Sequence, residues 1–139
     1  MGLQLCNCGA TAIGSGTTTI QAGPFPLPIT LNFDVNIRIC RNCMLADSSV
    51  IASFSATIPF IGTVTASFSG VPTGFPICTV ENGVQILEVE VAGDLILNGG
   101  EPDNVTFTLT LNSNNQVCID LSIGQITLPC LTVPVVFTC

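Results

Sequence analysis

The chain has 139 residues, of which 47% are hydrophobic, and its formal net charge is −7. A chain of this size can bury a core of its own within one domain. Arg38 and Arg41 are the only basic residues, which disfavours binding to nucleic acid or insertion at an anionic membrane surface. Because His, Lys, Tyr and Trp do not occur, most routes of acid-base catalysis are excluded, and we expect neither an enzyme nor a cofactor.

The N-terminal segment differs in composition from the rest of the chain. Residues 9–16 are mainly Gly, Ala, Ser and Thr and carry too little apolar area to fold alone. The sequence therefore predicts a flexible arm over residues 1–16, bearing Cys6 and Cys8, followed by one domain over residues 17–139.

Strand patterns dominate the remainder of the chain. Residues 29–39 alternate apolar and polar side chains throughout, which is typical of a half-buried strand. Gly, Pro and Asn clusters such as Asn82-Gly83 and Asn98-Gly99 separate the segments and indicate turns. The predicted strands cover residues 17–21, 29–39, 52–58, 63–69, 84–91, 94–98, 105–111, 117–123, 126–128 and 133–137.

The spacing of these strands decides the expected fold class. No window shows the periodicity of an amphipathic helix, so the sequence predicts almost no helix. Many short strands with frequent turn signals favour an all-β fold. We expect a single antiparallel β-sandwich, with jelly-roll topology preferred over an immunoglobulin-like one.

The eight cysteines allow three kinds of chemistry. Cys6-x-Cys8 and Cys40-x-x-Cys43 together offer four thiolates for zinc, but the first pair is too closely spaced for a typical site. Cys40-x-x-Cys43 also has redox spacing, without the βαβ pattern that usually surrounds it. Disulfides are the favoured reading, and we expect no bound metal.

Cys118 has a predicted orientation. In the strand over residues 117–123 the apolar side chains alternate with Cys118, Asp120 and Ser122, which places Cys118 on the outer face. An exposed thiol on a rigid strand would suit a cross-link to an arm cysteine of another copy. The other disulfide candidates are Cys43, Cys78, Cys130 and Cys139.

Two polar motifs are interpreted as parts of strands and not as functional sites. Glu88 and Glu90 point to the same face of a predicted strand, and a solvated face is favoured over a catalytic carboxylate pair. Asn104-Val105-Thr106 matches a glycosylation sequon, but it opens a predicted strand and is read as part of it.

The chain resembles the disulfide-cross-linked subunits of bacterial endospore appendages. The resemblance lies in the flexible arm with its cysteines, the single β-sandwich and the further cysteines on its body. That resemblance implies a jelly-roll body, sheets that augment one another between subunits, and arm cysteines that bond to other subunits. It makes Cys6 and Cys8 the arm cysteines and Cys118 or Cys40 their acceptors. Spore-coat and exosporium lattice proteins are related possibilities.

Together these features predict a structural subunit that assembles with copies of itself into an extracellular fibre. Edge strands would pair between copies, and disulfides would lock the contacts. The N-terminus shows no pattern of a secretion signal, so we expect an extracellular, cell- or spore-surface location that is reached through lysis of the producing cell or through a leader removed by processing. The alternative is a secreted or surface-displayed binding module that presents loops such as residues 70–76.

Overall fold

The computed structural model describes residues 9–20, 28–39, 48–58, 62–74, 76–123 and 126–137, and of residues 122–123 and 126–127 it describes the backbone alone. Over these residues the fold is all-β and antiparallel, as predicted, with no helix. The cysteines at positions 6, 8, 40, 43 and 139 lie outside the described residues.

Twelve strands make up the described fold. Ten of them belong to one sheet, and the other two form a small separate pair. Their bounds are β1 Ala10–Ile20, β2 Ile29–Ile39, β3 Ser49–Ile58, β4 Gly62–Pro72, β5 Ile77–Glu81, β6 Val84–Leu97, β7 Asp103–Asn112, β8 Gln116–Ile119, β9 Ser122–Ile123, β10 Ile126–Thr127, β11 Leu131–Thr132 and β12 Val135–Phe137.

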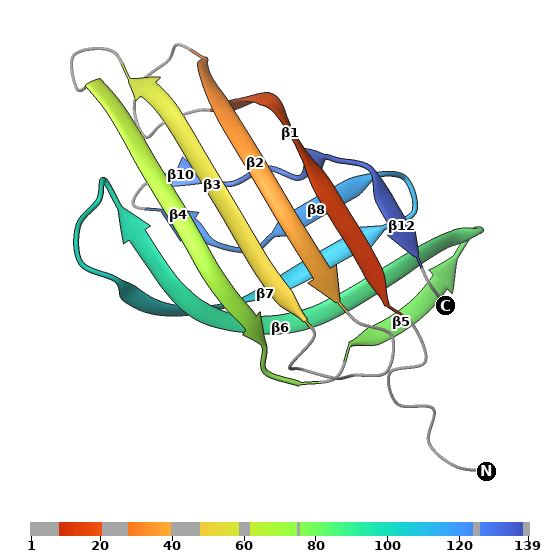
Figure 1. The fold of residues 1–139 in the computed structure, drawn as a ribbon. Coiled ribbons are helices and arrows are strands. Elements are labelled where there is room, and N and C mark those ends of the chain that lie inside the picture. The colour runs from red at the N-terminus through yellow and green to blue at the C-terminus, as the bar shows by residue number, and fades with distance from the viewer. Residues whose placement is uncertain are drawn as a thin grey trace.

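The large sheet curls into two layers that enclose the core. Its strand order is β11-β8-β7-β6-β4-β3-β2-β1-β12, with β5 added beside β6. Figure 1 shows β1 to β4 as one layer, lying across β6, β7 and β8 of the other. The strict alternation of β2 is confirmed, since each of its apolar residues is buried and each polar residue is exposed.

Strand β6 connects the two layers. It pairs with β7 over residues 86–95 and with β4 over residues 91–97. Gly70 of β4 and Gly93 of β6 are directly opposite each other. A Cβ atom on Gly93 would lie 2.2 Å from the Ser69 carbonyl oxygen, and one on Gly70 would lie 2.4 Å from that of Ala92. The backbones can therefore approach this closely only because both residues lack side chains.

The opposite side of the molecule is closed by the C-terminal segment. β11 pairs with β8 in one layer and β12 pairs with β1 in the other. Asn115, in the turn between β7 and β8, accepts hydrogen bonds from Val133 N at its carbonyl and from Val135 N at Oδ1, at 3.0 and 3.1 Å. This turn residue therefore fixes the segment at the point where it crosses from one layer to the other.

The core lies between the layers. Phe68 of β4 and Phe107 of β7 meet edge to face across it, with ring centroids 4.9 Å apart. Ile37, Leu87, Leu109, Leu111 and Leu131 are the largest of its fully buried side chains. The interior is therefore built mainly from aliphatic side chains of both layers, with buried phenylalanines that include this edge-to-face pair.

Several sequence predictions need correction. β1 starts at Ala10, so residues 10–16 belong to the sheet and not to a flexible arm, because pairing with β2 along the whole strand satisfies their backbone groups. The two strands predicted over 84–91 and 94–98 form the single strand β6. The strand predicted over 117–123 is interrupted after Ile119, where Leu121 N donates to the Ile119 carbonyl. The jelly-roll strand order stays a prediction.

Candidate functional site

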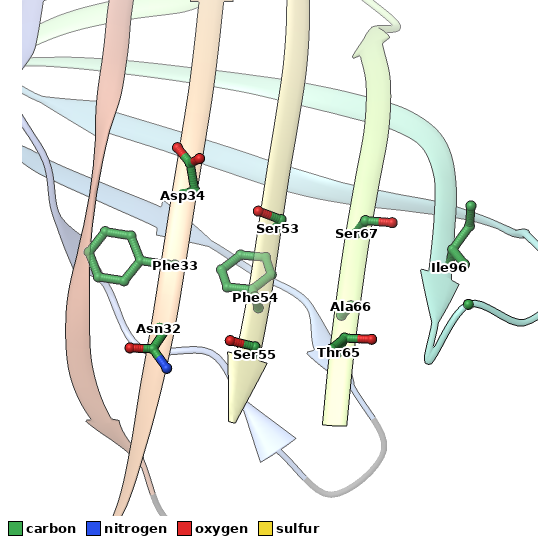
Figure 2. Close-up of a pocket in the computed structure, with 11 residues that line it drawn as sticks. Asn32, Phe33, Asp34, Ser53, Phe54, Ser55, Thr65, Ala66, Ser67 and Ile96 are labelled. Carbon is green, nitrogen blue, oxygen red and sulfur yellow. The ribbon is translucent and has the colours of Figure 1, made fainter. Parts of the chain in front are cut away.

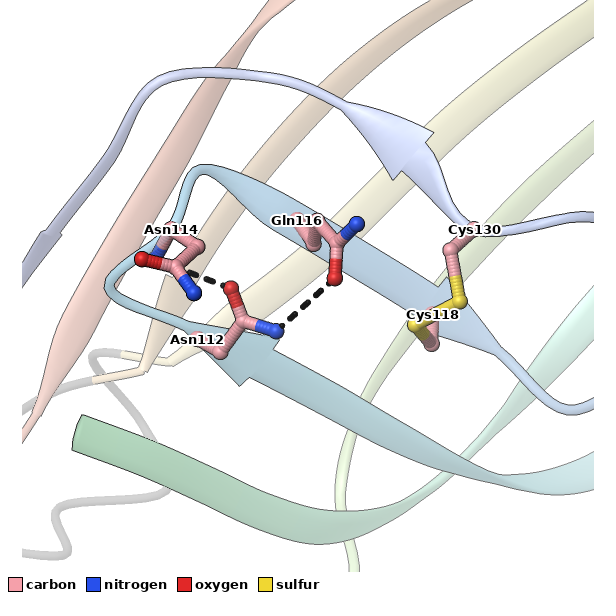
Figure 3. Close-up of a disulfide and its surroundings, with 5 residues drawn as sticks. All are labelled: Asn112, Asn114, Gln116, Cys118 and Cys130. Atoms are coloured by element: carbon pink, nitrogen blue, oxygen red, sulfur yellow. Dashed lines mark hydrogen bonds between the residues drawn. A yellow bond between two sulfur atoms is a disulfide. The ribbon is translucent and has the colours of Figure 1, made fainter. Parts of the chain in front are cut away.

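The disulfide between Cys118 and Cys130 lies on the outside of the β8 layer (Figure 3). Val117 and Ile119 point into the core, so Cys118 projects to the opposite face as predicted. The segment before β11 passes beside β8, with 4.2 Å between the two Cα atoms. The expectation that Cys118 accepts an arm cysteine from another copy was wrong, because the structure bonds it within its own chain.

The remaining described cysteine is Cys78 on β5. It is half-buried against the core, and it too is disulfide-bonded. The cross-linking roles predicted for Cys6, Cys8 and Cys40, and the disulfide roles of Cys43 and Cys139, fall on residues outside the described part of the chain. Within the described ranges, no group of three or more potential ligand side chains gathers in the geometry of a metal site.

Strand β5 is the most exposed apolar element of the described structure. It pairs with β6 alone among the described strands. Val80 and Ile77 have exposed fractions of 67% and 62%, the highest of the large hydrophobic side chains that the structure describes. They are an odd number of residues apart, so they stand on opposite faces of the strand. Strand β5 thus presents apolar side chains on both faces of a sheet edge.

The turn that joins β5 to β6 explains why this edge forms. Asn82 and Gly83 have φ angles of 52° and 81°, which gives the two-residue turn favoured in hairpins. The turn places Glu81 opposite Val84 and Ile77 opposite Glu88. The sequence predicts this turn, but β5 was not among the predicted strands. The signal was present, since the β-branched residues Ile77, Thr79 and Val80 lie within five residues before Asn82.

A second sheet edge is found on β1. Strand β12 pairs only with residues 10–12 of β1. From Ile13 to Ile20, β2 is the only described strand beside β1. This stretch contains no charged residue and no proline, which are the usual devices that prevent edge strands from pairing with other chains.

The outer face of the β1–β4 layer is polar but almost uncharged. Small polar side chains from neighbouring strands, together with Phe33 and Phe54, line a hollow of ≈ 490 Å³ on this face. Figure 2 shows Asp34, Ser53 and Ser67 side by side on three successive strands, with Ile96 of β6 at the rim. Hydroxyl and amide groups here can exchange hydrogen bonds with a polar surface or ligand.

Glu88 and Glu90 lie on the outer face of the other layer. Both are exposed, and Thr73 Oγ1 donates to Glu90 Oε1 at 3.1 Å. They border a second hollow of ≈ 340 Å³, together with Ile77 and Thr108. The arrangement agrees with the solvated strand face expected for this pair. Asn104 and Thr106 are likewise exposed, on β7.

The loop proposed for the alternative binding module is shorter than expected. Strand β4 continues through Pro72, so residues 70–72 belong to the sheet. Thr73 extends the contact with β6, since its amide donates to the Glu90 carbonyl at 2.9 Å. The region predicted to be a presenting loop is therefore largely held by β6.

Among the described residues, there is no helix with the length and apolar character needed to cross a membrane. Comparison of the chain with protein-family models, with curated proteins and with solved structures finds no match.

Proposed function

We propose that this chain is a structural subunit that joins copies of itself into a fibre by pairing strands at sheet edges. The observation that carries the proposal is strand β5, an edge on which Ile77 and Val80 are mostly exposed. Covering two such side chains would contribute about 1.5–3 kcal/mol each. The main-chain hydrogen bonds of an added strand would supply the direction of the contact.

The second edge, on β1, gives the contact a polarity. β5 and residues 13–20 of β1 are different surfaces of one molecule, so pairing one with the other in the next copy is a head-to-tail contact. Contacts of this kind form open filaments when their rotation does not close a ring. An uncharged Gly/Ser/Thr edge on β1 does little to oppose the approach of β5.

Disulfides between copies form the covalent part of the proposal. Cys118 and Cys130 are bonded to each other, so they serve the stability of the subunit. The candidate cross-linking residues are Cys6, Cys8 and Cys40. This division resembles that of endospore appendage subunits and fits an extracellular or spore-surface setting, where disulfides persist.

Lysine substitutions on β5 test the strand-pairing contact. We expect the double variant Ile77→Lys/Val80→Lys to remain monomeric where the unaltered protein forms large assemblies, because burying two charges at the contact is costly. Sedimentation velocity and electron microscopy measure the outcome. A matched control is Ser53→Lys/Ser67→Lys, which adds the same charge on the exposed outer face of the other layer and should assemble normally.

Three results would each overturn a different part of the proposal. Assembly of the β5 variant at the unaltered level would remove β5 from the contact. A monomeric unaltered protein at high concentration, under oxidising conditions, would remove the fibre itself. Assemblies that boiling detergent dissolves equally well with and without reductant would remove the disulfides between copies.

The hollow on the β1–β4 layer favours a second candidate, a binding module for a polar ligand. Its polar lining, which includes Asn32, Asp34 and Ser53, offers many hydrogen-bonding groups, and its two aromatic residues, Phe33 and Phe54, are buried. A protein that stays monomeric with all cysteines paired internally would favour this module over the fibre.

A further inference from the structure

Two Asn-Gly turns in the structure have nearly the same backbone. Asn82 and Gly83 have φ angles of 52° and 81°, and Asn98 and Gly99 have φ angles of 53° and 70°. Both asparagines are exposed. Asn82 lies just before the start of β6, and Asn98 lies directly after its end. The pair is therefore a comparison, within one molecule, of the same dipeptide in the same kind of turn.

The two asparagine side chains differ in how they are held. Asn98 extends the pairing of β6 with β4, because its amide N donates to the Thr65 carbonyl at 2.8 Å and its Oδ1 accepts from Thr65 N at 2.8 Å. Among the described residues, no hydrogen bond of the Asn82 side chain is found. The Asn82 amide can therefore rotate, whereas that of Asn98 is fixed.

We propose that Asn82 is a site of spontaneous deamidation and that the fold protects Asn98 from the same reaction. The Gly83 amide nitrogen attacks Cγ of Asn82. A bond forms between Gly83 N and Asn82 Cγ, the bond from Cγ to Nδ2 breaks, and ammonia leaves with the proton released from Gly83 N. Water then opens the succinimide to give aspartate or isoaspartate.

The two turns differ in the freedom of the asparagine side chain and not in the space around the glycine. A Cβ atom at either Gly83 or Gly99 would have no atom within 4 Å, so neither glycine is crowded by another part of the described chain. For Asn98, rotation of Cγ toward Gly99 N would first break the bond from Thr65 N to Oδ1. The hydrogen bond that completes the β4 edge is thus also what slows the chemistry at Asn98.

The product changes the part of the molecule that carries β5. Isoaspartate adds a methylene group to the main chain inside a two-residue turn and adds a negative charge next to Glu81. Since β6 is the only described neighbour of β5, a lengthened turn loosens β5 from its register. The expectation that aged protein loses the ability to assemble rests on the proposed function. The deamidation of Asn82 does not depend on that function.

The test uses the unaltered, oxidised full chain, incubated at mildly alkaline pH and sampled over days. Cleavage after glutamate separates the two sites, since Asn82 falls in peptide 82–88 and Asn98 in a second peptide that begins at Val91 and continues past the resistant Glu101–Pro102 bond. Mass spectrometry with isoaspartate detection then follows each peptide. We expect Asn82 to convert at least about fivefold faster than Asn98, the factor corresponding to one ordinary hydrogen bond.

A parallel incubation in denaturant supplies the control. There both Asn-Gly pairs lose their structure, and we expect them to react at similar rates. Equal rates in the folded protein, a faster reaction at Asn98, or no reaction at Asn82 would each overturn the proposal. If Asn82 and Asn98 reacted at unequal rates in denaturant as well, the hydrogen bond to Asn98 Oδ1 would not be the cause of the difference. Sedimentation of the aged sample separates the fate of the modification from that of the proposed fibre.

Discussion

Replacing Gly93 by alanine is expected to lower the free energy of unfolding by about 3 kcal/mol or more, the upper end of the range for overpacked sites. The new Cβ would lie 2.2 Å from the Ser69 carbonyl oxygen and 2.4 Å from Cα of Gly70. Both are backbone atoms of the paired strand, so no side-chain rotation relieves the clash. Denaturant titration followed by circular dichroism measures the change.

Gly70 provides a second variant and Gly74 the control. A Cβ on Gly70 would lie 2.4 Å from the Ala92 carbonyl oxygen and 2.6 Å from the Phe68 ring, so Gly70→Ala should also be strongly destabilising. A Cβ on Gly74 meets nothing within 4 Å, and Gly74→Ala should change stability by less than about 0.5 kcal/mol. Equal stability of the Gly93 and Gly74 variants would contradict the close approach of the β4 and β6 backbones at Gly70 and Gly93.

Removing the disulfide with Cys118→Ser/Cys130→Ser is expected to cost about 3 kcal/mol, since a loop of roughly 15 residues loses about that much by the chain-entropy estimate. The two cysteines are 12 residues apart. The loop that they close carries Leu128, which is buried in the core. The disulfide therefore limits the freedom of a segment that must return to the core on folding.

Denaturant midpoints of the double variant and the unaltered protein measure this cost. Alanine at both positions is the control for hydroxyl groups, and it should give the same loss within about 0.5 kcal/mol. A double serine variant as stable as the unaltered chain would show that the bond contributes nothing. Cleavage before Asp120 gives an independent check, because the two resulting fragments should stay joined until a reductant is added.

The edge on β5 shows which parts of the candidate site can be predicted from the sequence. Asn82-Gly83 was recognised as a turn from composition alone, and its φ angles bear this out. The short run before it was not predicted as a strand, because the sequence of Ile77–Glu81 lacks a clean alternation of apolar and polar residues. Its exposure depends on which strands lie beside it, and local patterns do not encode neighbours.

The cysteines illustrate the same limit. Alternation in the sequence correctly predicted that Cys118 faces away from the core. It could not predict the partner, since eight cysteines permit 105 complete pairings. The partner was decided by the path of the chain after β8, which brings Cys130 back beside Cys118.

The sequence by itself determined the all-β class, the faces of strands such as β2, and the positions of the tight turns. These depend on local rules, namely the two-residue period of a strand and the backbone freedom of Asn and Gly. Tertiary structure alone decided that β6 runs unbroken through Gly93, that residues 10–16 join the sheet and that Cys118 bonds to Cys130. Each of these depends on contacts between segments distant in the chain, where close packing and backbone hydrogen bonding outweigh local preference.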